Sequence, residues 1–446
     1  MNISKFFLPF VDALTISVFA FFTFGNYVLS VSQLVFVVLW LLFITLITLF
    51  FQKFYEEKRT FLKNTLTLFN SLAIGITITS LVALFLGNSA ITYLLLVIFT
   101  LFTFIGIIAI RVVCAIFSKF RRTKNVLIVG AGQDGKLMAE EIAKRKDLKL
   151  KVVGFLDDNM NSIEDEDSTI PILGLTCDSE AVIKDNNVKL VIIAVKSRMD
   201  SSILTDLVRG IPLGVKVWRM YKFYEKITSK FLVSKMSVNW LFYDCVRKKA
   251  LIYAYIKRFC DIIASIAILL ITLPLSIIAI LGIKLSDLGP IFFTQMRIGK
   301  LGKPFKMIKF RTMYQDEVAD DFDDDLTEVE LNDKRIMPFC RILRKFHIDE
   351  IPQMLNVLRG DMSIVGPRPV REEVYYENRE NIPFWECRNW VRPGWCGWQQ
   401  VKVNEPTAEE RLGYDLYYIK HRNVIWEFAI FISFVGKVIL GKARGK

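Results

Sequence analysis

Four long apolar segments at the start of the chain constrain its fold more than any other feature of the sequence. They cover residues 8–31, 34–51, 67–86 and 91–117, and each is near or above the ~20 residues that a helix needs to span a bilayer. Hydrophobic residues make up 53% of the chain, which also favours a membrane protein. We therefore expect residues 1–120 to form a transmembrane four-helix bundle.

Basic residues beside these segments predict the orientation of the bundle. The connection at 52–64 carries four Lys or Arg residues, and a second basic stretch at 119–124 follows the fourth segment. Because Lys and Arg are enriched in cytoplasmic loops, we place both stretches and the N-terminus in the cytoplasm. The formal net charge of +13 indicates anionic partners. A lipid bilayer and phosphate substrates fit such a protein better than nucleic acid does, so we expect no nucleic acid as a partner.

The sequence at 121–245 has the pattern of a soluble, Rossmann-like α/β domain. A predicted buried strand is followed by Gly130, Gly132 and Gly135 and by a helical stretch, and a second predicted strand ends at Asp157. In dinucleotide-binding βαβ units, such glycines let a phosphate approach the backbone, and an acid about 20 residues further on binds the ribose. These four residues are therefore candidates for binding a nucleotide. A structural or regulatory role of the domain is the alternative interpretation.

A short helix is predicted in the second half of the chain. Pro352 is tolerated in the first turn of a helix, where its missing N–H costs nothing. Apolar residues at Ile351, Leu355 and Leu358 recur at helical spacing. Gly360 is a suitable C-terminal stop.

Two adjacent carboxylates, Asp349 and Glu350, come just before this helix. Asp349 would lie at or next to the N-cap, where the helix dipole favours a negative charge, and an ionised Asp can attack phosphorus. Glu350 could hold Mg²⁺, which commonly takes one or two carboxylates plus phosphate oxygens. Arg344 and Arg368 could pair with phosphate. For an isolated pair of this kind, an N-cap followed by a surface residue is the alternative and the commoner interpretation.

Further cations lie on a predicted strand at 305–313. Lys309 and Arg311 would share one face of that strand, because side chains alternate with a period of two. They could bind a diphosphate or a lipid phosphate. A basic surface that faces lipid headgroups is the alternative.

The residues around the carboxylate pair form the run RKFHIDEIPQMLNVLRGDMSIVGPRP, which starts at Arg344. This run resembles the signature of the monotopic phosphoglycosyl transferases, bacterial sugar transferases that start glycan assembly on a polyprenyl phosphate. His347 departs from the signature, which usually has Ser there, and we expect it to be a local capping substitute. Matching motifs extend the resemblance over roughly residues 255 to 440: Lys257-Arg258-Phe259-x-Asp261, Gly289-Pro290-x-Phe292-Phe293, Gln295-x-Arg297-x-Gly299, Lys306-x-x-Lys309-Phe310-Arg311-Thr312-Met313 and Arg392-Pro393-Gly394.

The resemblance implies an undecaprenyl-phosphate glycosyl-1-phosphate transferase, which moves a sugar-1-phosphate from a UDP-sugar to undecaprenyl phosphate. Asp349 would carry a covalent phosphosugar after UMP leaves, and Glu350 and Asp349 would hold Mg²⁺. The product would start a capsule, exopolysaccharide or lipopolysaccharide O-antigen. The resemblance also implies a homodimer in the bacterial inner membrane with its catalytic domain on the cytoplasmic face. Phosphate-binding residues would be Lys309, Arg311, Arg344 and Arg368.

A fifth apolar run at 260–283 is long enough to span the membrane, but Pro274 lies at its centre. Proline in a helix interior costs about 3 kcal/mol. A complete span would place the carboxylate pair outside the cell, away from cytoplasmic nucleotide sugars. We therefore expect a re-entrant helix at 257–286 that breaks at Pro274 and returns to the same face, as the resemblance also implies. A proline-kinked span is the alternative.

The expected architecture is a membrane protein of the α plus α/β class with three parts. These are the bundle at 1–120, a Rossmann-like, CoA-binding-like domain at 121–245, and a monotopic α/β catalytic domain at 246–446 that ends in an interfacial amphipathic helix. A non-catalytic scaffold or regulator of a polysaccharide assembly complex remains an alternative function. An NAD-dependent sugar-nucleotide modifier would need Tyr-x-x-x-Lys in the α/β domain, and Tyr221-x-x-x-Glu225 does not supply it.

Overall fold

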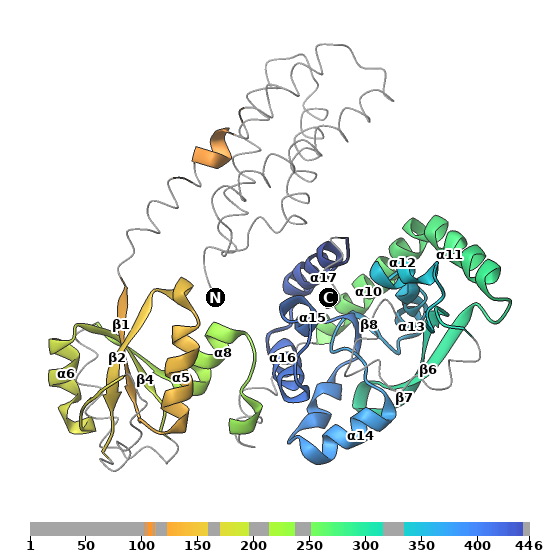
Figure 1. The fold of residues 1–446 in the computed structure, drawn as a ribbon. Helices are drawn as coiled ribbons and strands as arrows, with labels where there is room; N and C mark the ends of the chain where they lie inside the picture. Colours follow the sequence, from red (N-terminus) through yellow and green to blue (C-terminus); the bar gives the residue numbers. More distant parts are fainter. Residues whose placement is uncertain are drawn as a thin grey trace. The chain divides into compact units, whose positions relative to one another are not determined.

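The computed structural model divides the chain into two compact units, Met1–Ile227 and Thr228–Lys446, and each is described by itself (Figure 1). The expected four-helix bundle at 1–120 lies almost wholly outside the described residues. The structure describes residues 102, 105–109, 112, 123–158, 170–195, 214–236, 251–314 and 334–439.

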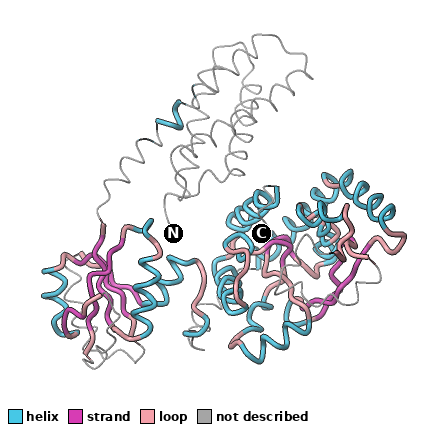
Figure 2. Tube along the Cα trace, in the orientation of Figure 1, coloured by secondary structure: helices cyan, strands magenta, loops and turns pink. Residues whose placement is uncertain are grey.

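The first unit contains a five-stranded parallel sheet with the strand order β3-β2-β1-β4-β5 (Figure 2). Helices α5 (Gln133–Ala143) and α6 (Ser179–Asp185) lie on opposite sides of the sheet (Figure 1). The central strands are apolar and buried because helices cover both faces. This arrangement confirms the expected α/β fold with a parallel sheet. The strands are β1 (Lys124–Val129), β2 (Leu150–Leu156), β3 (Ile172–Gly174), β4 (Val188–Ile193) and β5 (Lys216–Arg219); the other helices are η1 (Lys146–Leu148), η3 (Thr176–Asp178) and α8 (Met220–Thr228).

The first two long helices of the second unit, α10 (Leu251–Ile271) and α11 (Leu273–Ser286), form a bent pair. Their axes differ by 60°. Pro274 lies in the first turn of α11, where a proline is tolerated, and the break falls at Thr272. Within the described residues, the only candidate for crossing a membrane is this pair taken together, because each helix alone is too short or too polar. The expected helix–break–helix is therefore present.

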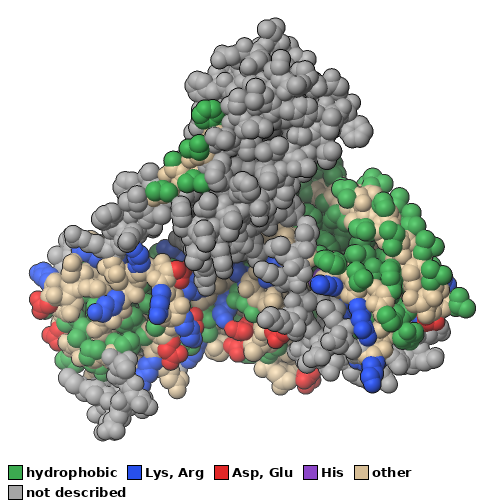
Figure 3. Space-filling view, turned by 45° about the horizontal axis from the view of Figure 1, so that its top comes forward, with side chains coloured by type: hydrophobic (Ala, Val, Ile, Leu, Met, Phe, Trp, Pro, Cys, Tyr) green, Lys and Arg blue, Asp and Glu red, His purple; other side chains and the backbone are tan. Residues whose placement is uncertain are grey.

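Large apolar side chains cover the outer face of this pair. Tyr255, Phe259 and Leu270 of α10 are 65–75% exposed, and Leu285 of α11 is 88% exposed. Figure 3 shows hydrophobic side chains gathered over the side of this unit where α11 lies. A contiguous apolar surface of this kind is unusual for a protein face that contacts water.

The rest of the second unit consists of short strands and helices around two clusters of buried hydrophobic residues. Strands β6 (Phe292–Ile298) and β7 (Pro304–Phe310) form an antiparallel hairpin, and β8 (Ser363–Val365) pairs in parallel with β9 (Gly394–Cys396). The helices are η5 (Val233–Lys235), η7 (Lys300–Gly302), α12 (Cys340–Lys345), η9 (Ile348–Glu350), α13 (Gln353–Arg359), α14 (Glu372–Asn381), η10 (Trp385–Trp390), α15 (Trp398–Lys402), α16 (Ala408–His421) and α17 (Val424–Ile439).

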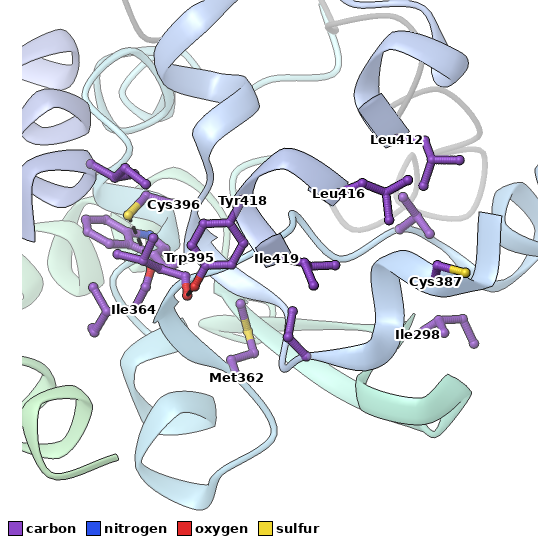
Figure 4. Packing of buried hydrophobic residues seen from close by; sticks show 14 of the residues in the cluster. Ile298, Met362, Ile364, Cys387, Trp395, Cys396, Leu412, Leu416, Tyr418 and Ile419 are labelled. Atoms are coloured by element: carbon purple, nitrogen blue, oxygen red, sulfur yellow. Dashed lines mark hydrogen bonds between the residues drawn. The ribbon is translucent and has the colours of Figure 1, made fainter. Parts of the chain in front are cut away.

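The core of this unit joins β6, β8, β9, η10 and α16 (Figure 4). Phe231 and Val233 belong to this core, and Phe231 N–H also donates to the carbonyl of Gly413 at 3.1 Å. These residues therefore pack with the second unit, whereas the expected division between residues 245 and 246 lies outside the described residues and stays a prediction. Helix α17 buries Phe434 fully, whereas Ile425 and Phe428 are 74% and 63% exposed; its expected interfacial amphipathic character stays a prediction.

Candidate functional site

The two adjacent carboxylates lie in η9, one turn before α13. His347 precedes them with a left-handed backbone (φ 55°), Pro352 is the N-cap of α13, and Gly360 ends that helix with φ 97°. The predicted stop at Gly360 is therefore confirmed. Asp349 is the second residue of η9, which places it three residues ahead of the N-cap that was expected to hold it.

The predicted helix is present as α13, but its apolar residues do not all lie on its buried face. Leu355 is 38% exposed, whereas Met354 and Val357 are fully buried. The turn in η9 sets the phase of α13 so that its buried face also carries Gln353 and Asn356. The helical spacing of apolar residues alone could not show this, because two polar residues share the buried face with Met354 and Val357.

Both carboxylates are buried. Asp349 is 3% exposed and Glu350 is fully buried, so the interpretation of Glu350 as a surface residue is wrong. Glu350 Oε1 lies 2.9 Å from Nη2 of Arg368 and 3.6 Å from Nζ of Lys309. A buried carboxylate of this kind is tolerated because cations compensate it.

The electrostatics of Glu350 follow from these neighbours. Burial alone would raise the pKa of its carboxyl group, but the charges of Arg368, Lys309 and His347 outweigh burial and hold that pKa well below its usual range. Glu350 therefore stays ionised in the folded protein. The site combines a fixed negative charge with two cations that can also face an anionic ligand.

The cations named in the sequence do not all converge. Arg311 forms an ion pair with Asp287, and its Nε donates to the carbonyl of Pro290 at 2.6 Å, so it braces the loop after α11. Lys309 instead turns to Glu350. The two side chains therefore serve different neighbours, although they lie two residues apart on the chain. Arg344 is buried on α12, the helix that packs against η9.

Helix α11 packs against the segment that carries the carboxylate pair. Ala279 and Ile283 of α11 share a cluster of buried residues with Cys340 of α12 and Ile351, directly after Glu350. Burial, with the charge of Asp349 as the second cause, raises the pKa of the Cys340 thiol to about 12. Cys340 is therefore a packing residue and not a thiolate nucleophile.

His347 is not the capping substitute that its position suggested. It makes no side-chain cap hydrogen bond, and its ring instead packs edge-on against Phe434 with the centroids 5.7 Å apart. His is among the non-glycine residues that adopt a left-handed backbone most readily.

Two residues of α13 were missed as site residues. Asn356 bridges α13 to β7: its Oδ1 accepts from Ile308 N–H at 3.0 Å, and its Nδ2 donates to the carbonyl of Lys306 at 2.7 Å. Gln353 lies three residues after Glu350, on the same helical face, and is 2% exposed. Its Nε2 is buried without an acceptor among the described residues. Both residues belong to the family signature, but only the fold shows that Asn356 braces β7 and that Gln353 offers an N–H donor.

The carboxylate pair fits a magnesium site that is completed by a substrate. In the parts of the chain that the structure describes, three or more His, Cys, Asp or Glu side chains never gather as a ready-made metal cage. Asp349 and Glu350 are adjacent, and Glu350 Oε2 is buried and accepts no hydrogen bond from a described residue. Mg²⁺ commonly binds through one or two carboxylates and takes its other ligands from phosphates and water.

In the first unit, the structure brings the four candidate nucleotide-binding residues to one edge of the sheet. A Cβ on Gly135 would lie 2.0 Å from the carbonyl oxygen of Gly130, so this glycine permits close packing, whereas a Cβ on Gly132 would meet nothing within 4 Å. Asp157 Oδ2 accepts from Ala131 N–H at 2.7 Å. The acid expected at a ribose therefore binds the glycine loop itself.

Comparisons with known proteins match both units. Residues 252–441 match the family described as bacterial sugar transferase, and residues 51–209 match the family described as CoA-binding domain. An exopolysaccharide production protein, PSS, of Rhizobium leguminosarum bv. phaseoli is 37% identical over 204 residues, which cover 43% of this chain and 97% of that protein.

Two larger relatives carry more explicit names. A UDP-N-acetylgalactosamine-undecaprenyl-phosphate N-acetylgalactosaminephosphotransferase of Aeromonas hydrophila is 35% identical over 196 residues, 43% of this chain, so the match spans less than half (45%) of that relative. An undecaprenyl-phosphate glucose phosphotransferase of Komagataeibacter xylinus is 28% identical over 345 residues, which cover 72% of this chain and 60% of the relative.

Proposed function

The chain belongs to the bacterial sugar transferase family, and from this premise we propose that it transfers a sugar-1-phosphate from a UDP-sugar to undecaprenyl phosphate. The observation that carries the proposal is the buried Asp349–Glu350 pair, with Lys309 and Arg368 at one oxygen of Glu350. The Asp349 carboxylate is suited to attack a phosphoryl group, because the charge of the neighbouring Glu350 is compensated by two cations.

In the first step, an Asp349 carboxylate oxygen attacks the β-phosphorus of the UDP-sugar. The bond between that phosphorus and the oxygen bridging to the α-phosphorus breaks, and the bond electrons leave with UMP. The sugar phosphate is then covalently bound to Asp349. Lys309 and Arg368 lie where they can offset the charge of the diphosphate, and Gln353 Nε2 can donate to a phosphoryl oxygen.

In the second step, an oxygen of undecaprenyl phosphate attacks the same phosphorus from the membrane side. The bond between phosphorus and Asp349 breaks, and the carboxylate is restored. The product is a sugar linked to the lipid through a diphosphate, which would start an exopolysaccharide, capsule or O-antigen repeat. Glu350 and Asp349 would hold Mg²⁺, which supplies charge neutralisation on the diphosphate when bound.

We place the second unit at the cytoplasmic face of a bacterial inner membrane, with α10 and α11 dipping into the bilayer. The exposed apolar face of this pair and the 60° bend support this position. A bent pair that enters and leaves on one face keeps the carboxylates on the side where nucleotide sugars occur. The first unit would act as a structural or regulatory domain, and a homodimer remains a prediction.

Release of UMP tests the proposal. The full chain in nanodiscs, with Mg²⁺ and undecaprenyl phosphate, is offered UDP-glucose, UDP-N-acetylgalactosamine and other UDP-sugars one at a time. We expect UMP with one sugar, no release from Asp349→Asn, and loss of release with EDTA that returns on adding Mg²⁺. With the acceptor verified, a complete absence of UMP across the panel would reject the proposed reaction.

A further inference from the structure

Arg368 lies in a backbone segment, residues 367–370, in which every carbonyl group accepts a hydrogen bond. Four successive carbonyl oxygens of this segment accept hydrogen bonds from donors on other parts of the second unit, at distances from 2.8 to 3.3 Å. The donors, in order along the segment, are Gly394 N–H, Arg388 Nη2–H, Arg297 Nη1–H and Ile298 N–H. The direction in which the Arg368 side chain leaves the backbone is therefore set from outside its own loop.

Only one of these donors acts at Arg368 itself. Arg388 Nη2 donates to the carbonyl of Arg368 at 2.9 Å, and the same guanidinium binds Asp415 of α16 through Nε at 3.0 Å and Nη2 at 2.8 Å. Arg388 and Asp415 are each 2% exposed, and the guanidinium also lies over the ring of Trp385, 4.5 Å from its centroid.

A buried ion pair is weak evidence for stability, since a hydrophobic pair of similar volume is often as stable or more so. The pair is better explained by what it orients. Arg388 is fixed on two sides, by Asp415 and by Trp385, and holds the carbonyl of Arg368 on a third. Arg368 then reaches Glu350 at 2.9 Å.

We propose that Arg388 and Asp415 are positioning residues that set Arg368 against Glu350. This inference rests on the proposed function for its consequence in catalysis. The pair touches neither of the two carboxylates, and it acts by fixing the main chain from which the Arg368 guanidinium extends. Displacement of a catalytic group by about 1 Å can cost on the order of 100-fold in rate.

The test is a double-mutant cycle on UMP release. Arg388→Met is expected to lower kcat about 10- to 100-fold with little change in the KM for the UDP-sugar. In the Arg368→Met background, the same substitution should change kcat by no more than about 2-fold, because the group that it positions is already gone. Equal factors in both backgrounds would overturn the proposal.

Two further variants separate positioning from folding. The paired replacement Arg388→Met with Asp415→Leu leaves no buried unpaired charge, so it should fold and still lose kcat. Glu410→Gln is the matched control. Glu410 lies in α16, as Asp415 does, and the substitution removes its ion pair with Lys230; we expect parental kcat. A paired variant with parental kcat would contradict the positioning role.

Hydrogen exchange gives a readout that does not need catalysis. The amides of residues 363–371 should exchange faster in the paired variant than in the parent and in Glu410→Gln. Unchanged exchange in this segment would overturn the inference. If the parent itself releases no UMP, the proposed function fails, while the exchange comparison still decides whether Arg388 and Asp415 hold the segment.

Discussion

Arg368 and Glu350 form an ion pair of 2.9 Å in which the carboxylate is fully buried and the guanidinium is partly accessible. Lys309 approaches the same oxygen, Oε1, at 3.6 Å. One oxygen of Glu350 therefore carries both cationic contacts, which leaves Oε2 for another cation. The ion pair thus joins the Arg368 guanidinium, which would face the substrate, to the Glu350 carboxylate, which would bind a metal.

Replacement of Arg368 should affect catalysis more than replacement of an ordinary surface arginine. We expect Arg368→Met to lower kcat about 100- to 1,000-fold, the range found when one group that stabilises transition-state charge is removed. Steady-state UMP release measures the effect. Arg359→Met, on the exposed side of α13, is the matched control and should keep the parental rate. Similar losses in both variants would contradict a specific role.

Gly394 should not tolerate a side chain. A Cβ at this position would lie 2.0 Å from the backbone nitrogen of Gly366, just before the 367–370 segment. We expect Gly394→Ala to destabilise the second unit by about 1–3 kcal/mol, because neither backbone can move without breaking the pairing of β8 and β9. Thermal unfolding of the full chain measures this. Gly132→Ala, where a Cβ meets nothing within 4 Å, should cost less, since it changes only the N-cap of α5.

Asn356 should contribute to stability through its two bonds to β7. Asn356→Ala leaves the N–H of Ile308 and the carbonyl of Lys306 without this partner, and we expect a loss of about 1–3 kcal/mol. Urea unfolding, followed by tryptophan fluorescence, measures the change. Asn381→Ala removes only a bond to a carbonyl of its own helix, at Glu377, and should cost far less. Equal losses would argue against the brace.

Cys340 should resist alkylation well above neutral pH. Burial raises the pKa of its thiol to about 12, whereas an unfolded cysteine ionises at about 8.5. The folded state thus retains the proton longer, so this group's contribution lowers stability as pH rises from about 8.5 towards 12. Iodoacetamide at pH 8 should modify the exposed Cys177 and spare Cys340, as read by peptide mass spectrometry. Fast native modification of Cys340 would show that its burial is wrong.

The proposed membrane position of α10 predicts a specific labelling pattern. Cys260 lies on the exposed side of α10, and Cys177 is exposed in the first unit. In nanodiscs, a charged maleimide should label Cys177 and leave Cys260 unmodified, while denaturation in SDS should expose both. Comparable labelling of the two thiols in intact nanodiscs would place α10 in water.

Local patterns in the sequence predicted the features that depend on local chemistry. Gly360 ends α13 because a left-handed residue is needed there, and Pro274 breaks the long apolar run, although the break falls at Thr272. The α/β fold of the first unit, though not its strand order, also followed from its glycine loop and apolar runs. The burial of Glu350 needed the fold, because it depends on Arg368, which lies 18 residues further on.

Other features could not be predicted because their partners are distant in sequence. Arg311 and Lys309 shared one predicted face, yet Asp287, 24 residues before Arg311, takes Arg311 away from the carboxylates. Arg388 and Asp415 lie 27 residues apart in separate helices, and no motif in the sequence links them. Position along the chain shows which charges exist, whereas the fold decides which of them meet.

Helix α13 begins three residues after Glu350 and ends where Arg258 of α10 donates to the carbonyls of Val357 and Leu358, at 2.5 and 2.7 Å. Its seven residues, at about 1.5 Å each, measure about 10 Å. With α10 in the bilayer as proposed, the length of α13 sets the distance between this membrane helix and the carboxylate pair. Under the proposed function, the same spacing would set how far an acceptor phosphate must reach from α10 to meet Asp349.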